Sequence, residues 1–235
     1  MGVLGEYSGD ARAAGLRAQG AAYEKLTSKH VTLAYELVAV VAQTAPGTDG
    51  KYRRRESSQI IRSMLDEAHA NGFKLVLDVQ PGRSSAGDEM AALRPFLIDP
   101  DVYLALDPEF SMSASEVPGQ QIGEMAAADV SRAVDILEEI IGTAHLPPKV
   151  LIVHQFRWDM LPDKAHIKTS ALVDIVLDMD GFGSQPLKLS SYRDVMQQGR
   201  LAFAGIKLFY RQDQHLFTPE QVLALTPSPS VVIYQ

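Results

Sequence analysis

The sequence contains no cysteine. This absence excludes a disulfide framework, a thiolate zinc site, an iron–sulfur cluster and a cysteine nucleophile. Long apolar runs are missing as well, because none approaches the roughly 18 residues that a membrane-spanning helix needs. The glycine-rich motifs G-x-G-x-x-G and G-x-x-x-x-G-K-[ST] are also absent, so the sequence gives no support for a nucleotide-binding loop.

Basic residues are outnumbered: 22 Lys and Arg stand against 29 Asp and Glu, and the formal net charge is −7. Proteins that bind nucleic acid normally present a basic surface, so this balance argues against a nucleic-acid partner. Aromatic residues make up only 7%, which disfavours a long polysaccharide cleft lined with stacking rings. The expected partner is a small-molecule or saccharide substrate.

The remaining composition is that of an ordinary globular protein, and 235 residues suffice for one sizeable core. We therefore expect a single domain over residues 1–235. The sequence shows no internal repeat, low-complexity tract, linker or signal peptide.

Eight short runs rich in Val, Ile and Leu alternate with helical patterns. The runs are Val3–Tyr7, Tyr35–Val41, Phe73–Val79, Val102–Leu106, Lys149–Phe156, Val173–Met179, Gly205–Tyr210 and Ser230–Tyr234. This alternation is typical of a parallel sheet built from βα units. Eight strands about thirty residues apart predict a single (β/α)8 TIM-type barrel of the α/β class rather than an open doubly wound sheet.

Some of the connecting helices can be placed. Ser57–Ala70 and Glu124–Ile141 carry apolar residues at helical spacing. Thr218 followed by Pro219 predicts the start of a short helix. Residues 157–170 show poor periodicity, which indicates a long loop with a helical turn. No helix is expected after the eighth strand, so the barrel would lack its final helix.

Polar side chains gather at the carboxyl ends of the predicted strands, whereas the strand middles are Val, Leu, Ile and Ala. The strand-end residues are Glu6 and Tyr7, Asp78 and Gln80, Asp107 and Glu109, His154 and Gln155, Asp178 and Asp180, Lys207 and Tyr210, and Tyr234. In barrels of this type the chemistry lies at that face, where the strand ends converge. The distribution predicts an active site there.

Several carboxyl groups that share one mouth cannot all ionise at low cost, because like charges and burial raise the pKa of some of them. Glycoside hydrolysis needs such a pair, one group acting as an acid and its partner as a nucleophile or base. We assign Glu109 as the general acid and Asp107 or Asp178 as the nucleophile or base. The residues expected to bind substrate are Glu6, Asp78, Gln80, His154, Gln155, Trp158, Asp180, Lys207, Tyr210 and Tyr234. No cofactor is required for this chemistry.

Other interpretations of the same residues stay open. A metal-dependent hydrolase or lyase would hold Mg²⁺ or Ca²⁺ through hard oxygen ligands, here Asp78, Asp107, Glu109, Asp178 and Asp180. A barrel that binds a saccharide without catalysis is a third class. Lys207 also has a structural interpretation, because a lysine in an apolar strand is costly unless a carboxylate inside the barrel pairs with it.

Five segments of the sequence resemble those of an uncharacterised bacterial family of secreted proteins and lipoproteins with a glycoside-hydrolase-like barrel. They are Leu77–Arg83, Ala105–Glu109, Val153–Phe156, Asp180–Gly183 and Lys207–Tyr210. The resemblance covers the chain from Gly2 to Tyr234 and implies a TIM barrel without an established activity. It also implies an extracytoplasmic location if an export segment has been removed. The present chain lacks an export segment and a lipidated cysteine, and without such processing a cytoplasmic location is expected.

Overall fold

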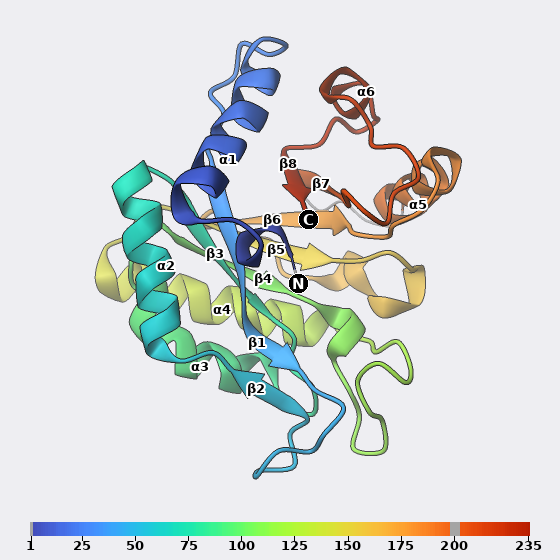
Figure 1. Cartoon of the computed structure of the whole chain (residues 1–235). Coiled ribbons are helices and arrows are strands. Elements are labelled where there is room, and N and C mark those ends of the chain that lie inside the picture. The colour runs from blue at the N-terminus through green and yellow to red at the C-terminus, as the bar shows by residue number, and fades with distance from the viewer. Residues whose placement is uncertain (1, 198–202) are drawn as a thin grey trace.

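The computed structural model describes residues 2–197 and 203–235. One eight-stranded sheet runs through the molecule in the order β2-β1-β3-β4-β5-β6-β7-β8. All neighbours pair in parallel except β1 and β2, which form an antiparallel pair. The sheet curls, with helices packed on its outer side (Figure 1). The predicted α/β fold of barrel type is confirmed, and no helix follows β8 within the described residues.

The strands coincide closely with the predicted apolar runs. Their bounds are β1 Ala34–Ala42, β2 Arg53–Arg55, β3 Lys74–Val79, β4 Val102–Leu106, β5 Lys149–His154, β6 Val173–Met179, β7 Phe203–Leu208 and β8 Val231–Tyr234. Most central strands are buried on both faces, which explains why they appear in the sequence as nearly continuous apolar runs.

Six α-helices are described, and the sequence pattern had placed three of them. The bounds are α1 Gly9–Glu24, α2 Ser58–Asn71, α3 Ala86–Leu97, α4 Ala127–Ala144, α5 Gln185–Gln197 and α6 Pro219–Leu223. Ser57 accepts a hydrogen bond from Ile60 N at the start of α2, and Gly72 ends that helix in the left-handed conformation. The loop predicted after β5 is present, with two 3-10 turns, η3 Trp158–Met160 and η4 Lys164–His166.

The first predicted strand is wrong. Val3–Gly5 form a 3-10 turn, η1, and α1 begins at Gly9. The run Val3–Tyr7 is short and interrupted by Gly5, so it has few side chains that favour a strand. The eighth strand of the sheet is instead β2, which pairs with the end of β1.

The curled sheet is open between β1 and β8, a gap that we call the seam. Within residues 2–197 and 203–235 no ladder joins these two strands. The N-terminal segment lies across the seam: η1 contacts β1, and a Cβ built on Gly2 would lie 3.6 Å from Gln235 Cγ. Arg12 Nη1 of α1 donates to Leu4 O at 2.9 Å, which ties the segment to the helix behind it.

Two apolar layers support the fold. The larger one lies between the sheet and helices α2, α3 and α4 and includes Leu65, Leu93 and Leu137. A small inner layer fills the inside of the curl with Val76, Ala105, Ile152 and Val176. Polar side chains, among them Asp78, His154 and Asp178, follow on the same strands at the carboxyl side of this inner layer. None of the described helices is long and apolar enough to cross a membrane.

Candidate active site

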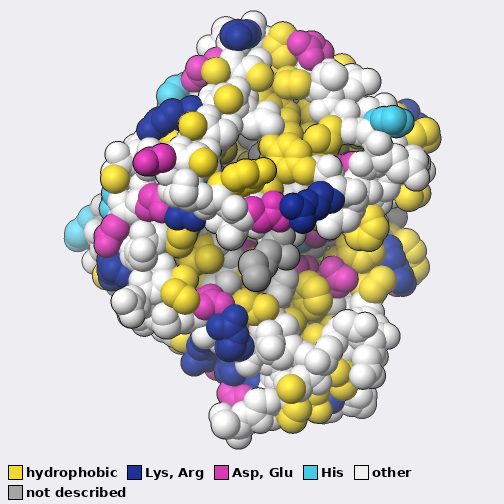
Figure 2. Space-filling model, in the orientation of Figure 1, with side chains coloured by type: hydrophobic (Ala, Val, Ile, Leu, Met, Phe, Trp, Pro, Cys, Tyr) yellow, Lys and Arg dark blue, Asp and Glu magenta, His cyan; other side chains and the backbone are white. Residues whose placement is uncertain are grey.

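A cavity of about 2140 Å³ opens at the carboxyl ends of the strands and continues along the seam. Its wall includes residues from β1, β3, β4, β5, β7 and β8, Asp180 directly after β6, and residues of η1 and α1. Acidic, basic and hydrophobic side chains meet on the face that carries it (Figure 2). The cavity is large enough to take a substrate of several rings.

Glu36 of β1 is a carboxylate on the inner side of the curled sheet. The preceding Tyr35 packs edge-on against Phe73 in the outer core, with ring centroids 5.3 Å apart, so alternation turns Glu36 to the inside of the sheet. Its Oε1 lies 3.4 Å from His154 Nε2 and 3.6 Å from Lys207 Nζ. Burial alone would raise the pKa of Glu36, but Lys207 and His154 outweigh it and lower the pKa to about 2. Glu36 is therefore ionised.

His154 ends β5 and is fully buried. Its Nδ1 lies 3.0 Å from Asp178 Oδ2, whereas its Nε2 has no hydrogen-bond partner. Burial and the Lys207 charge act to lower the pKa of His154, yet the carboxylates Asp178 and Glu36 raise it well above its usual range. The ring is thus held by one carboxylate on its Nδ1 side and faces a second on its Nε2 side.

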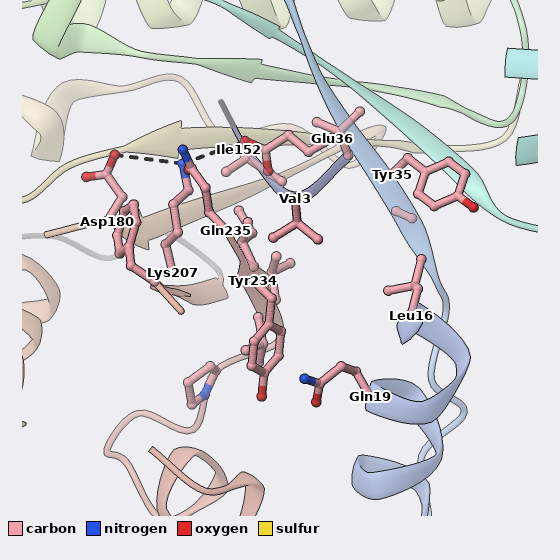
Figure 3. Close-up of a pocket in the computed structure, with 18 of the residues that line it drawn as sticks. Val3, Leu16, Gln19, Tyr35, Glu36, Ile152, Asp180, Lys207, Tyr234 and Gln235 are labelled. Atoms are coloured by element: carbon pink, nitrogen blue, oxygen red, sulfur yellow. Dashed lines mark ion pairs between the residues drawn. The ribbon is translucent and has the colours of Figure 1, made fainter. Parts of the chain in front are cut away.

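Lys207 of β7 lies between two carboxylates. Its Nζ is 3.6 Å from Glu36 Oε1 and 4.0 Å from Asp180 Oδ2, as the dashed lines in Figure 3 mark. Burial alone would lower the pKa of Lys207, but the charges of Glu36 and Asp180 raise it. The lysine therefore carries its charge, and it has the internal ion pairs that the structural interpretation of this residue required.

Four further carboxyl groups are pushed towards the neutral form. Burial raises the pKa of Asp78 to about 6. Burial, and then the charge of Asp78, raise the pKa of Asp107 well above its usual range. Burial also raises the pKa of Glu109 and that of Asp180, and the negative charge of Asp180 adds to the rise at Glu109. The site therefore combines carboxyl groups whose pKa values are shifted in opposite directions, upwards for these four and downwards for Glu36.

Glu109 is positioned by a 3-10 turn, η2 Pro108–Phe110, that follows β4 directly. Gly123 N donates to Glu109 O at 2.7 Å. A Cβ at Gly123 would lie 2.3 Å from Ser111 O and 2.9 Å from Glu109 O, so only glycine allows the two segments to approach this closely. On the neighbouring strand ends, Gln80 Nε2 donates to Asp107 Oδ2 at 3.3 Å.

Aromatic rings surround the mouth of the cavity. Tyr210 and Tyr234 stack with centroids 5.6 Å apart, and Gln19 Nε2 of α1 donates to the Tyr210 hydroxyl at 2.7 Å. Tyr7 and Phe182 also line the cavity, with 55% and 62% of their surfaces exposed. Exposed rings of this kind present flat apolar faces on which a sugar ring can stack.

The structure brings most of the predicted site residues together. Those that line the cavity are Glu6, Asp78, Gln80, Asp107, Glu109, Asp180, Lys207, Tyr210 and Tyr234. Glu6 lies at the rim, where Arg211 Nη2 donates to its Oε2 at 2.9 Å. His154 lies directly behind the wall, in contact with Glu36.

Three more predicted residues, like His154, do not line the cavity. Gln155 is buried and points the other way: its Nε2 donates to Arg157 O at 2.9 Å, and its Oε1 accepts from Lys164 Nζ at 3.0 Å. Trp158 is 62% exposed on η3. Asp178 is fully buried, and its Oδ2 lies 3.0 Å from His154 Nδ1.

Glu36 and Phe182 are site residues that sequence reasoning missed. Glu36 is the third residue of the nine-residue strand β1, whereas the polar pattern that predicts the site involves residues at strand ends. A charged residue within the apolar run Tyr35–Val41 is itself a signal, because a buried carboxylate is costly without a partner. The same argument had singled out Lys207, which contacts Glu36.

Two groups of side chains have the spacing of a metal site. In Glu36, Asp78 and His154 one ligand atom from each residue lies within 4.8 Å of the others. His69, Asp99 and Asp101 form a similar but more exposed group, near the start of β3 and therefore at the opposite end of the strands.

Comparisons with known proteins give fold-level likeness only. No family model matches the chain, and no curated protein matches its sequence. Solved structures with a similar fold include the cellulase Cel5C_n, with a TM-score of 0.42, 16% identity, and coverage of 74% of this chain and 55% of that one. The catalytic domain of Thermobifida fusca endoglucanase Cel5A (E5) has a TM-score of 0.44, 11% identity, and coverage of 75% and 61%. A further endoglucanase has a TM-score of 0.38, 8% identity, and coverage of 92% and 81%.

This chain thus spans little more than half the length of the first two structures. Their printed names describe cellulases and endoglucanases, and at these identities and TM-scores the likeness does not identify an activity for this chain.

Proposed function

We propose that this protein is a hydrolase of the glycosidase type that acts on a saccharide in the cavity at the carboxyl ends of the strands. The observation that carries the proposal is the presence of Glu109 and Asp180 on the wall of one cavity, with Lys207 Nζ 4.0 Å from Asp180 Oδ2. Both carboxyl groups line the cavity, and the charge of Asp180 raises the pKa of Glu109. Cleavage of a glycosidic bond requires one carboxyl group as an acid and a second as a nucleophile or base, and the cavity supplies both groups.

Glu109 is the general acid in this scheme. Burial and the charge of Asp180 raise its pKa, which favours the protonated form that can donate a proton to the oxygen of the leaving group. Asp180 is the nucleophile or base. Although burial raises the pKa of Asp180, Lys207 Nζ at 4.0 Å acts against that rise and favours the carboxylate form. Asp107 is one of the two nucleophile or base candidates expected from the sequence, Asp178 being the other. Its pKa is raised well above its usual range, and it fits a hydrogen-bonding role better.

The rim indicates a short saccharide. Stacking surfaces come from Tyr7, Phe182 and Tyr210, which are all exposed and line the cavity. Polar groups that can accept or donate to sugar hydroxyls lie beneath them, including Gln80 and Asp107. Three rings at one mouth suit a few sugar units better than an extended polymer.

The test is hydrolysis of a panel of chromogenic glycosides by the wild-type chain and by the variants Glu109→Gln and Asp180→Asn. Each substitution is expected to lower kcat/KM by about 100-fold or more, because each removes a group that moves a proton or forms a bond in the transition state. Glu124→Gln is the matched control, since Glu124 is exposed and lies outside the cavity wall.

The role of Glu109 as acid and the role of Asp180 as nucleophile or base can be distinguished by changing the leaving group of the substrate. Glycosides with an activated leaving group need little protonation, so they should restore much of the rate to Glu109→Gln and little to Asp180→Asn. Unchanged hydrolysis by folded Glu109→Gln, or equal losses in Glu124→Gln, would remove Glu109 from the mechanism.

A further inference from the structure

At the wall of the cavity, three ligand atoms from three strands converge. They belong to Glu36 of β1, Asp78 of β3 and His154 of β5, and all lie within 4.8 Å of one another. Glu36 Oε1 and His154 Nε2 are 3.4 Å apart. Two ligands bound at about 2.0–2.1 Å in a tetrahedral site are separated by roughly this distance.

Two of the three groups lack the hydrogen bonds that buried polar atoms normally have. His154 Nε2 and Asp78 Oδ1 are both buried without a partner, and the two side chains are 0% and 2% exposed. A buried acceptor or donor without a partner costs about 1–3 kcal/mol, and such groups are rare in native proteins. Both residues belong to the same converging group, so one ion bound between them can interact with both side chains.

His154 is arranged as a metal ligand. Its Nδ1 lies 3.0 Å from Asp178 Oδ2, a contact that orients the ring and, in the neutral tautomer, leaves the Nε2 lone pair directed at Glu36. Histidines that bind metals commonly have a carboxylate or carbonyl on the other ring nitrogen in this way. Asp178 lies outside the cavity wall and, in this arrangement, acts only through His154.

The charges around this point also favour a cation. The buried interior holds five carboxyl groups, those of Glu36, Asp78, Asp107, Asp178 and Asp180, against two basic groups, His154 and Lys207. Besides Asp78, single oxygens of Asp107, Asp178 and Asp180 are buried without partners. An acidic interior with unpaired oxygens gains from a divalent ion.

We propose that Glu36, Asp78 and His154 bind a divalent transition-metal ion such as Zn²⁺ or Mn²⁺. One imidazole and two carboxylates suit these ions better than Mg²⁺ or Ca²⁺, which prefer oxygen alone. The all-oxygen set expected from the sequence differs from this one, because only Asp78 is common to both. The inference goes beyond the proposed function: Glu109 and Asp180 are not ligands, so either proposal can fail without the other.

Lys207 gives the proposal a distinctive signature. Its ammonium lies 3.6 Å from Glu36 Oε1 and would repel a cation bound there. Lys207→Met keeps an unbranched side chain of similar length and removes this charge. Metal affinity should therefore increase in Lys207→Met, whereas loss of a ligand should decrease it.

Isothermal titration calorimetry on the full chain, freed of metal with EDTA, tests the site with Zn²⁺, Mn²⁺ and Mg²⁺ separately. We expect one Zn²⁺ or Mn²⁺ per chain, bound at least tenfold more tightly than Mg²⁺. Glu36→Gln, Asp78→Asn and His154→Gln should each weaken binding at least tenfold, and Lys207→Met should strengthen it severalfold. His69→Ala is the control, because it removes a histidine from the exposed group with Asp99 and Asp101.

Circular dichroism of each variant shows whether it is folded, and an anomalous-scattering map of crystals grown with Mn²⁺ locates the ion even if one ligand variant does not fold. The expected peak lies between Glu36, Asp78 and His154. The proposal is overturned if no ion binds, if the ligand variants bind as the wild type does, or if binding disappears in His69→Ala. A peak at His69 or elsewhere overturns it equally.

Discussion

Gly123 packs against the backbone of Pro108, Glu109 and Ser111 so closely that no side chain fits there. A Cβ at this residue would lie 2.3 Å from Ser111 O and 2.9 Å from Glu109 O and Pro108 O, all of which are backbone atoms. Backbone can yield only by moving the turn η2, which carries the proposed general acid. The position of Glu109 therefore depends on Gly123, a residue that has no reactive side chain.

We predict that Gly123→Ala lowers kcat/KM for a cleaved glycoside by about tenfold or more, because small displacements of a catalytic group are costly. The melting temperature should also fall by several degrees, since overpacking costs typically 1–3 kcal/mol. The two measurements are hydrolysis and thermal unfolding.

Gly142→Ala is the matched control. Gly142 lies in α4, and an added Cβ would meet nothing within 4 Å. Alanine there should raise stability by roughly 0.5–1 kcal/mol and leave hydrolysis unchanged. Full activity in Gly123→Ala would show that η2 tolerates the displacement and that Glu109 does not depend on this contact.

At the scale of elements, β2 is anchored by a buried carboxylate as well as by its ladder with β1. Glu89 of α3 is fully buried, and its oxygens lie 2.8 Å from Arg53 Nε and 2.6 Å from Arg55 Nε. Burial alone would raise the pKa of Glu89, but hydrogen bonds from Arg55, Ser84 and Arg53 outweigh it and lower the pKa. The arginine run that follows β1 is thus used to hold β2 on α3.

We predict that Glu89→Gln destabilises the protein by about 2–3 kcal/mol at pH 7. This is below the 3–5 kcal/mol typical of a broken buried pair, because the Arg55 side chain is 42% exposed and can be hydrated. The free energy of unfolding in urea measures the loss.

The pH dependence has a definite sign. A carboxyl group with a lowered pKa stabilises the fold above its unfolded pKa of about 4.5, and this contribution is lost as the pH falls through the lower folded value. The difference between wild type and Glu89→Gln should therefore shrink on acidification below pH 4.5. Glu139→Gln, which removes an exposed pair with Arg94, should cost less than about 1 kcal/mol, and an equal cost in both variants would contradict the account.

The elements that could be predicted from sequence were those with strong local signals. Seven of the eight expected strands are present, because buried parallel strands require continuous apolar runs, and α2 and α4 have clear apolar stripes. Helix α1 was not predicted: its sequence is rich in Ala and includes Gly15 and Gly20, so it has little amphipathic pattern. The pairing of β2 with β1 depends on contacts with Glu89 that are distant in sequence.

At the scale of the whole molecule, the curl of the sheet determines which groups meet. The strand-end pattern led us to expect Asp78, Glu109 and Asp180 on one face, and in the structure all three line one cavity. It did not predict that Glu36 reaches across the interior to His154, or that alternation turns Gln155 away. Those outcomes depend on strand register and side-chain direction, which follow from the assembled sheet rather than from any one segment.

The central claim is that carboxyl groups from separate strands form one saccharide-binding site. The most direct test is a crystal structure of Glu109→Gln soaked with a mixture of short oligosaccharides. The account predicts ordered sugar in the cavity, within hydrogen-bond distance of Asp180 and with one ring against Tyr210. Sugar bound only elsewhere on the surface, or a cavity without sugar at saturating concentration in crystals whose cavity is open to solvent, would contradict it.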